Sequence, residues 1–212
     1  NYLRKSEEVH HLALDADRAY PRRNVDTKEM VEALAKDWSA VSFTKGVAHQ
    51  TTRALYDEWV KYCLAREHKA ASQFYQISRK AKSSGMERPE LYDIFESYRK
   101  SLSDVLPHLI FSGTDQEKRN LLFDSSGLEL RFDQLSGGER EIAFLVGQID
   151  RFGLRNGLFL LDEPELHLNP DLVRTWVSYL GRTVLTGQIW LATHSLEVVE
   201  AAGQTATFLF ER

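Results

Sequence analysis

The sequence predicts an α/β fold in which a lobe with a mostly parallel sheet follows an α-helical subdomain. Two short apolar runs, 158–161 and 189–192, each end in polar residues and are separated by a helix-length stretch. This arrangement is typical of parallel strands joined by a crossover helix. Residues 48–82 contain neither Pro nor Gly and carry apolar side chains at helical spacing, which predicts one long helix. With 212 residues, 42% of them apolar, the chain can build a sizeable core.

The first 26 residues predict a short strand and a turn of the core. Leu12 to Leu14 supply the strand, and the turn carries Arg18, Arg22 and Arg23. These arginines could contact phosphate groups, but a solvated basic turn is the alternative interpretation.

Residues 27–107 predict a helical subdomain or arm. A first amphipathic helix spans 27–38, with Asp26 or Thr27 as its N-cap. A second helix spans 48–82, and a third spans about 89–105 and could return antiparallel to the second. The second helix ends in a basic run at 78–82, which could touch a nucleic-acid backbone or simply face solvent. No heptad pattern persists along these helices, so we expect a packed helical unit and not a true coiled coil.

Residues 108–212 predict the C-terminal lobe. Three short strands, 108–112, 120–124 and 127–132, come first, and the turn at 124–127 makes a hairpin of the last two. The hairpin leads directly into the next helix, whose orientation it would set.

That helix is predicted to start at Ser136, within the stretch LSGGE at 135–139. Ser136 and Glu139 form a capping box ahead of an apolar run. Gly137 and Gly138 lack a Cβ, which leaves the free N–H groups of the first turn open to an anion that the helix dipole favours. An ordinary capped helix with flexible glycines is the alternative.

The apolar run 158–161 predicts a strand buried on both faces, and it delivers Asp162 and Glu163 at its carboxyl end. Open α/β sheets place ligands at that edge. Two adjacent acids there suit phosphoanhydride hydrolysis, because one can hold Mg²⁺ while the other activates water. Two solvated acids capping a buried strand are the alternative.

Polar residues also follow the elements downstream. Asn169 as N-cap and Pro170 as the first helical residue begin a helix. The strand 189–192 then leads into His194, with Ser195 as a cap for the last helix. Beside the strand that carries the acids, His194 could hydrogen-bond a γ-phosphate or the attacking water.

These motifs follow one another as the signature, Walker B, D-loop and H-loop do in ABC-type ATPases. Glu139 and Asp162 are 23 positions apart, and Asp162 and His194 are 32 apart. Residues 120–212 therefore resemble the C-terminal half of an ABC-type ATPase domain. The stretch DEPELHLNP at 162–170 is similar to that of OLD, SMC-like and related AAA-type ABC ATPases.

The resemblance implies that ATP and Mg²⁺ are the cofactors. Ser136 and Gly138, with Gly137 and Glu139 in the same turn, would contact the γ-phosphate of an ATP that the opposite subunit holds. The protein would therefore act as a homodimer or higher oligomer through a nucleotide sandwich.

The resemblance also implies roles for the residues after the strands. Asp162 would support Mg²⁺, Glu163 would be the catalytic base and His194 would sense the γ-phosphate. Asn169 and Pro170 would lie in the D-loop at the dimer seam; transporters more often have Asp at the position of Asn169.

The sequence contains no G-x-x-x-x-G-K-[ST] motif, so it lacks the Walker A loop that cradles ATP. Either a P-loop lobe lies upstream in a longer polypeptide or another chain supplies it. We favour the upstream lobe, since the sequence begins at Asn1 without Met and ends just after an apolar, strand-like run at 207–210.

Composition and residue types argue against several classes of protein and site. A net charge of −4 argues against wholesale coating of nucleic acid. The lone Cys63 favours a reducing, cytoplasmic setting and is best interpreted as a buried apolar residue. No run approaches the length of a membrane span. Glu165 and His167 have the chemistry of metal ligands, but their position favours a structural or D-loop role.

The sequence therefore predicts an ATP-hydrolysing, dimerising ATPase that gates a nucleic-acid-directed effector, such as a nuclease, in phage defence or DNA repair. Nucleic acid is a further candidate partner, whereas a membrane is not expected. A nucleotide-gated scaffold that does not hydrolyse ATP is the alternative, and a transporter subunit is a weaker one.

Overall fold

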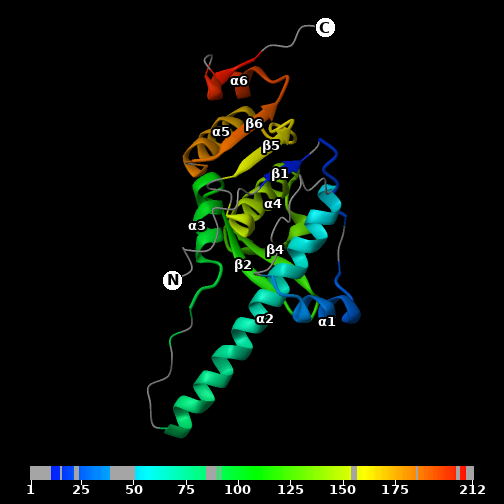
Figure 1. Cartoon of the computed structure of the whole chain (residues 1–212), viewed down its shortest axis with the longest axis vertical. Helices are drawn as coiled ribbons and strands as arrows, with labels where there is room; N and C mark the ends of the chain where they lie inside the picture. Colours follow the sequence, from blue (N-terminus) through cyan, green and yellow to red (C-terminus); the bar gives the residue numbers. More distant parts are fainter. Residues whose placement is uncertain are drawn as a thin grey trace.

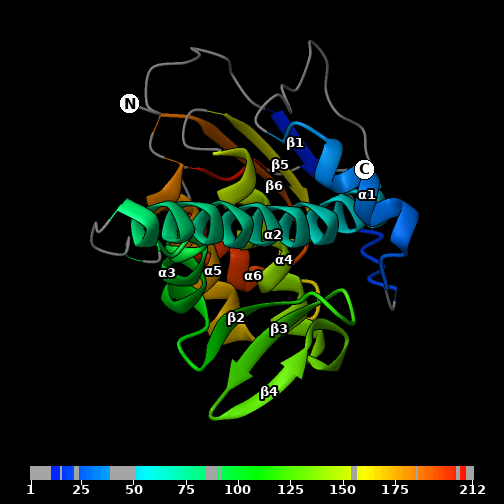
Figure 2. The ribbon, with the colours of Figure 1, turned by 90° about the horizontal axis from the view of Figure 1, so that it is seen from below.

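The computed structural model describes most of the chain, in the ranges 11–14, 16–21, 24–38, 51–84, 90, 92–153, 157–184, 186–203 and 206–208. Two small sheets lie on either side of a layer of helices (Figures 1 and 2). Arg22 and Arg23, expected in the first turn, lie outside the described residues.

Sheet A is parallel throughout, as the sequence predicts. Its strands are β1 (His11–Leu14), β5 (Leu158–Asp162) and β6 (Gln188–Ala192), in the order β1-β5-β6. Helix α5 (Pro170–Thr183) forms the crossover from β5 to β6, since parallel neighbours need a long connection. Helix α6 (Leu196–Ala202) follows β6. The carboxyl ends of β5 and β6 therefore lie next to each other.

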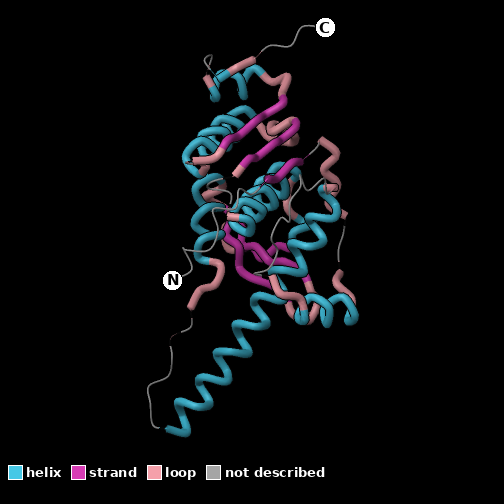
Figure 3. The backbone as a smooth tube through the Cα atoms, viewed as in Figure 1, coloured by secondary structure: helices cyan, strands magenta, loops and turns pink. Residues whose placement is uncertain are grey.

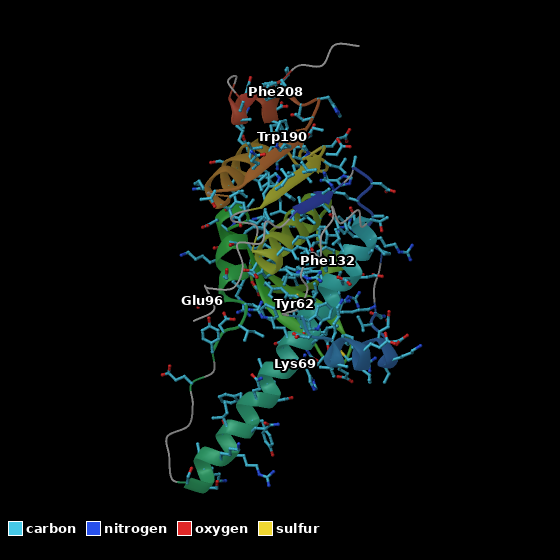
Figure 4. All side chains as sticks on the ribbon, in the orientation of Figure 1. Tyr62, Lys69, Glu96, Phe132, Trp190 and Phe208 are labelled. Carbon is cyan, nitrogen blue, oxygen red and sulfur yellow. The ribbon has the colours of Figure 1, made fainter. Side chains whose placement is uncertain are left out.

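The prediction that the strand 158–161 is buried on both faces is wrong. Phe159 and Leu161 are buried, whereas Leu158 and Leu160 are only half-buried. On the neighbouring strand Trp190 is 53% exposed and stacks on Phe208, as Figure 4 shows near the top of the molecule. Among the described residues, helices thus cover one face of sheet A more fully than the other. Thr207 and Phe208 are not in a strand, and 209–210 lie outside the described residues.

Sheet B is antiparallel and contains β2 (Leu109–Asp115), β3 (Asn120–Ser125) and β4 (Leu128–Arg131). Its β3–β4 turn is the predicted one: Ser126 and Gly127 both have positive φ, at 55° and 85°, and the Asp124 carboxylate accepts from the Gly127 N–H at 3.0 Å. A 3₁₀ turn, η1 (Phe132–Gln134), then leads into helix α4 (Gly137–Phe152). The hairpin thus leads into α4 through this turn, as the sequence predicts.

The helices before sheet B are α1 (Thr27–Ala35), α2 (Thr52–Ser84) and α3 (Glu96–Val105). Asp26 caps α1 through a complete capping box, one of the two caps that the sequence allows. Helix α2 is the predicted long helix, and its far end extends away from the body (Figures 1 and 3). Helix α3 packs mainly on α4 and β2, so the expected antiparallel pairing of α2 with α3 is not the main contact.

One continuous core joins the helices to both sheets. It includes side chains from β1, the first half of α2, α3, sheet B, α4, β5 and α5. Trp59 of α2 lies against Gly147 of α4, where an added Cβ would be 2.5 Å from the indole ring. Cys63 is buried in this core, which confirms its interpretation as a buried apolar residue, and burial raises the pKa of its thiol. None of the described helices has both the length and the apolar content to cross a membrane.

Candidate nucleotide-hydrolysis site

Helix α4 starts as the sequence predicts. Ser136 is the N-cap: its hydroxyl accepts from the Glu139 N–H at 3.3 Å, and the Glu139 carboxylate accepts from the Ser136 N–H at 2.8 Å. His108 lies 2.9 Å from the same carboxylate. Burial opposes ionisation of Glu139, but the bonds from His108 and Ser136 outweigh it and hold its pKa below the ordinary value. The capping box is therefore an ionised one.

The two glycines of the signature have a close neighbour in their own chain. A Cβ at Gly137 would lie 3.3 Å from Cβ of His167, and a Cβ at Gly138 would lie 2.9 Å from the His167 carbonyl oxygen. Leu168 and Leu172 also border Gly138. The sequence predicted glycines that leave the helix start open to an anion. In the structure one side of the glycines is instead filled by the turn that follows β5.

At the carboxyl end of β5, Asp162 is exposed and Glu163 adopts an unusual backbone conformation. Glu163 has a φ of 48°, in the left-handed region that residues other than Gly seldom adopt. Its N–H donates to the Ala192 carbonyl at 2.8 Å, which ties it to the end of β6. Such strain persists only where the surroundings enforce it, and it is common at active sites.

The end of β6 brings His194 to Glu163. His194 Nδ1 lies 3.5 Å from Glu163 Oε1, and the imidazole is largely exposed, with 80% of its side-chain surface accessible. The predicted neighbours Glu163 and His194 are therefore adjacent. Ser195 caps α6 by accepting from the Val198 N–H at 3.4 Å, also as predicted.

The turn between β5 and α5 is short and internally bonded. Asn169 accepts from the Leu172 N–H at 2.9 Å and Pro170 is the first helical residue, both as predicted. Glu165 accepts from the Thr193 hydroxyl at 2.7 Å, which links this turn to the residue before His194. Glu165 is thus engaged in holding the turn, in line with the structural role expected for it.

Sequence reasoning missed the role of Arg18 beneath this edge. Arg18 is buried, not a solvated or phosphate-facing residue of a basic turn, and it donates to Glu141 and to the carbonyl oxygens of Asp162 and Glu163. One signal was available: Glu141 is an acid inside the apolar stretch of the signature helix, and a fully buried carboxylate needs a partner.

The donor set at this edge suits a magnesium ion that arrives with a nucleotide. Mg²⁺ in such sites takes one or two carboxylates, and phosphate oxygens and water complete its shell. The Asp162 carboxylate is exposed, and no side chain within the described residues engages it. Those residues hold no group of three or more side chains that could bind a metal without a nucleotide.

A family model described as "AAA domain, putative AbiEii toxin, Type IV TA system" matches residues 33–200 of the chain. This range contains the start of α4 and the ends of β5 and β6. No curated protein matches the chain.

Several solved structures of SMC proteins are similar to the chain. One, described in work on ATP-driven dimerisation and DNA-stimulated activation of SMC ATPases, is 16% identical with a TM-score of 0.40, over 51% of this chain and 73% of that chain. The SMC head domain from Thermotoga maritima is 18% identical with a TM-score of 0.39, over 60% of this chain and 44% of that chain. An Smc head with an extended coiled coil, bound to the C-terminal domain of ScpA derived from Pyrococcus furiosus, is 15% identical with a TM-score of 0.39, over 68% of this chain and 36% of that chain. The chain thus spans less than half the length of the last two.

Proposed function

The chain belongs to the AAA domain family of putative AbiEii toxins, and on that premise we propose that it hydrolyses ATP between two subunits. The observation that carries the proposal is the meeting of Glu163 and His194, 3.5 Å apart, at the end of two parallel strands. A carboxylate and an imidazole there can orient one water against a γ-phosphate.

Each residue has a distinct part in this proposal. Glu163 accepts a proton from the attacking water, and His194 hydrogen-bonds the γ-phosphate or that water. Asp162 would hold Mg²⁺, and the bound ion would neutralise negative charge on the phosphates. Its exposed carboxylate supports this role.

The start of α4 supplies the other half of the site. Ser136, Gly137, Gly138 and Glu139 would meet the γ-phosphate of ATP held by a second subunit, since a helix N-terminus attracts anions. His167 and Leu168 pack behind the glycines, so the turn that leads to Asn169 and Pro170 would reach the same dimer seam. A Walker A lobe, from upstream in the polypeptide or from another chain, completes the site.

Substitution of Glu163 tests hydrolysis. In the full-length protein, Glu163→Gln should lower the rate by about 100-fold or more, the usual loss when a general base is removed, while ATP still binds. Glu200→Gln is the matched control, because it is an exposed acid on α6 just past His194. If Glu163→Gln hydrolyses ATP at the wild-type rate, the assignment of Glu163 as the catalytic base is wrong. If none of the three proteins hydrolyses ATP although all bind it, the chain is a nucleotide-gated scaffold instead.

Substitution of Ser136 tests the dimer separately. Ser136→Arg should abolish ATP-induced association in size-exclusion chromatography with light scattering, because a bulky cation would stand where the opposing nucleotide enters. Asn169→Ala should weaken association less, since the turn also keeps its backbone bonds at Leu166 and Leu168. Unchanged association in the Ser136 variant would mean that the signature does not act across subunits.

We further propose that the ATPase gates an effector directed at nucleic acid, in antiviral defence or DNA repair. The far half of α2 favours a nucleic-acid partner, because residues 68–84 contain four cations and no Asp or Glu in a chain of net charge −4. The cations are Lys69, Arg79, Lys80 and Lys82. Tyr75, 68% exposed, shares one helix face with Arg79 and Lys82, so a base could stack beside the charges.

Neutralisation of the cations on the far half of α2, called the arm from here on, tests this partner. Replacing Arg79, Lys80 and Lys82 together by Gln should weaken binding of a short duplex or single-stranded nucleic-acid probe. The negative slope of log affinity against log salt concentration should become shallower by about 2–3. The matched control replaces three exposed lysines elsewhere, Lys28, Lys100 and Lys118. Equal losses in both variants would show only general attraction to the probe, and the proposed role of the arm would be wrong.

A further inference from the structure

A buried arginine connects the helix that carries the signature to the strand that carries the acids. Arg18 follows β1 and is 6% exposed. One guanidinium nitrogen donates to Oε1 of Glu141, and the other donates to the carbonyl oxygens of Asp162 and Glu163, the latter at 3.1 Å. Three segments far apart in the sequence therefore meet at one side chain, where β1, α4 and β5 lie together in Figure 1.

Glu141 lies five positions after the cap residue Ser136, one turn into the signature helix. Its side chain is fully buried, and its second oxygen accepts from the Tyr20 hydroxyl at 2.7 Å. Burial and the neighbouring Glu141 raise the pKa of Tyr20, so its hydroxyl stays a proton donor. A buried carboxylate is tolerated only when it is paired and hydrogen-bonded, so Glu141 holds Arg18 firmly in place.

The other end of Arg18 acts on the backbone of Glu163. Glu163 is held at its N–H by the Ala192 carbonyl, and its carbonyl oxygen accepts from Arg18 and from the Leu166 N–H, each at 3.1 Å. Because φ at this residue is 48°, loss of the Arg18 contact would leave one bond on that oxygen and let the backbone relax toward an ordinary conformation. The carboxylate would then leave its place beside His194.

We propose that Arg18 is a positioning residue that couples the first turns of the signature helix to the orientation of Glu163. The inference rests on the proposed ATPase function and deepens it. A nucleotide docked by the second subunit at Ser136 acts on α4, α4 carries Glu141, and Arg18 transmits the position of Glu141 to the peptide of the base. Hydrolysis then requires the closed dimer, and not only bound ATP.

The test is Arg18→Lys in the full-length protein. Lysine keeps the charge opposite Glu141, but its single ammonium group lacks the planar fork that reaches the carboxylate and the two carbonyl groups together. The matched control is Arg99→Lys. Arg99 likewise pairs with an acid, Asp93, and donates to a strand carbonyl, that of Phe111 at 2.6 Å, but it lies on α3 away from the site.

Two readouts separate positioning from simple stabilisation. The hydrolysis rate at saturating ATP should fall about 10- to 100-fold in Arg18→Lys, the size of loss that a small misplacement of a reacting group produces, while ATP-induced association stays within about threefold. Amide hydrogen exchange without nucleotide should quicken both at residues 163–168 and at the start of α4. The Arg99 variant should show neither effect.

The possible results distinguish failure of the coupling from failure of the proposed hydrolysis. If amide exchange quickens at only one of the two regions, residues 163–168 or the start of α4, the coupling is wrong. The coupling is also wrong if the hydrolysis rate and ATP-induced association fall together in both arginine variants. If exchange quickens at both places while Glu163→Gln hydrolyses ATP like the wild type, the link stands and the proposed hydrolysis fails. Should Arg18→Lys not fold, Tyr20→Phe replaces it. This change removes one bond to Glu141 but leaves Arg18 in place, so it should lower the rate only about two- to fivefold.

Discussion

Helices α4 and α2 pack together around Trp59 and Gly147, but they differ in almost every other respect. Every residue of α4 from 141 to 149 is buried, and the helix is fixed at both ends, by the Ser136 cap and by Gly153 in the left-handed conformation. Helix α2 is buried only in its first half, up to Ala65 apart from Ala81 near its end. Figure 4 shows Tyr62 against the body and Lys69 where the helix leaves it.

The difference indicates that α4 serves to position the residues of the candidate site, whereas the far half of α2 is available for contact with a partner. The charges near the start of α4 are held inside the chain, Glu139 by His108 and Glu141 by Arg18. The far half of α2 instead presents cations with no acid in its own sequence from 68 to 84. Because α2 is a single helix without Gly or Pro, its near half sets the direction of its far half.

The largest effect is expected at the contact between the two helices. Trp59→Ala should destabilise the protein by about 3–5 kcal/mol, because the indole is 1% exposed and packs on Tyr98, Phe132 and Phe144. Tyr75→Ala, on the far half of the same helix, should change the free energy of unfolding by less than about 0.5 kcal/mol. Urea unfolding followed by circular dichroism measures both. Comparable losses would mean that the far half is as buried as the near half.

The same contact can be disturbed from α4. Gly147→Ala would place a Cβ 2.5 Å from the Trp59 ring, so we expect a loss of about 1–3 kcal/mol from overpacking. The matched control is Gly181→Ala on α5, where an added Cβ meets no atom within 4 Å. Alanine there should stabilise the helix by up to about 1 kcal/mol. A gain in both variants would show that α2 yields easily, and the two helices would not be rigidly packed.

Local signals in the sequence predicted local structure well. The caps at Asp26, Ser136, Asn169 and Ser195 depend on residues within four positions, and all of them form. The turn at Ser126 and Gly127 follows from an equally short pattern. Each of these features is decided by neighbours in sequence, whereas the parallel pairing of the two apolar strands followed from the helix-length stretch between them.

Contacts across long separations were not predicted. Arg18 and Glu141 are 123 positions apart, and a basic turn gives no sign of which acid it will meet. The packing of His167 on Gly137 likewise depends on how β5 and α4 come together, which no short pattern specifies. The half-buried Leu160 has the same origin, since its exposure depends on which elements cover each face of sheet A.

The smallest effect is expected at the start of α4, where it should depend on pH. Glu139→Gln should cost about 0.3–1 kcal/mol at neutral pH, because Gln can keep the capping bond but loses the negative charge that the helix N-terminus favours. Hydrogen bonds from His108 and Ser136 hold the pKa of Glu139 below its ordinary 4.5 in the folded state, despite the opposing effect of burial. The folded state therefore binds this proton more weakly than the unfolded state, and the contribution of Glu139 is full above pH 4.5.

As the pH falls below that value and through the lower folded-state pKa, the carboxylate is protonated and the advantage over Gln disappears. Urea unfolding of the wild type and Glu139→Gln across the acidic range measures the change, with Glu129→Gln on the exposed hairpin as control. A difference that stayed constant with pH would mean that Glu139 caps the helix as a neutral acceptor. The start of α4 would then not need the charge of Glu139, although His108 and the Ser136 N–H both contact that carboxylate.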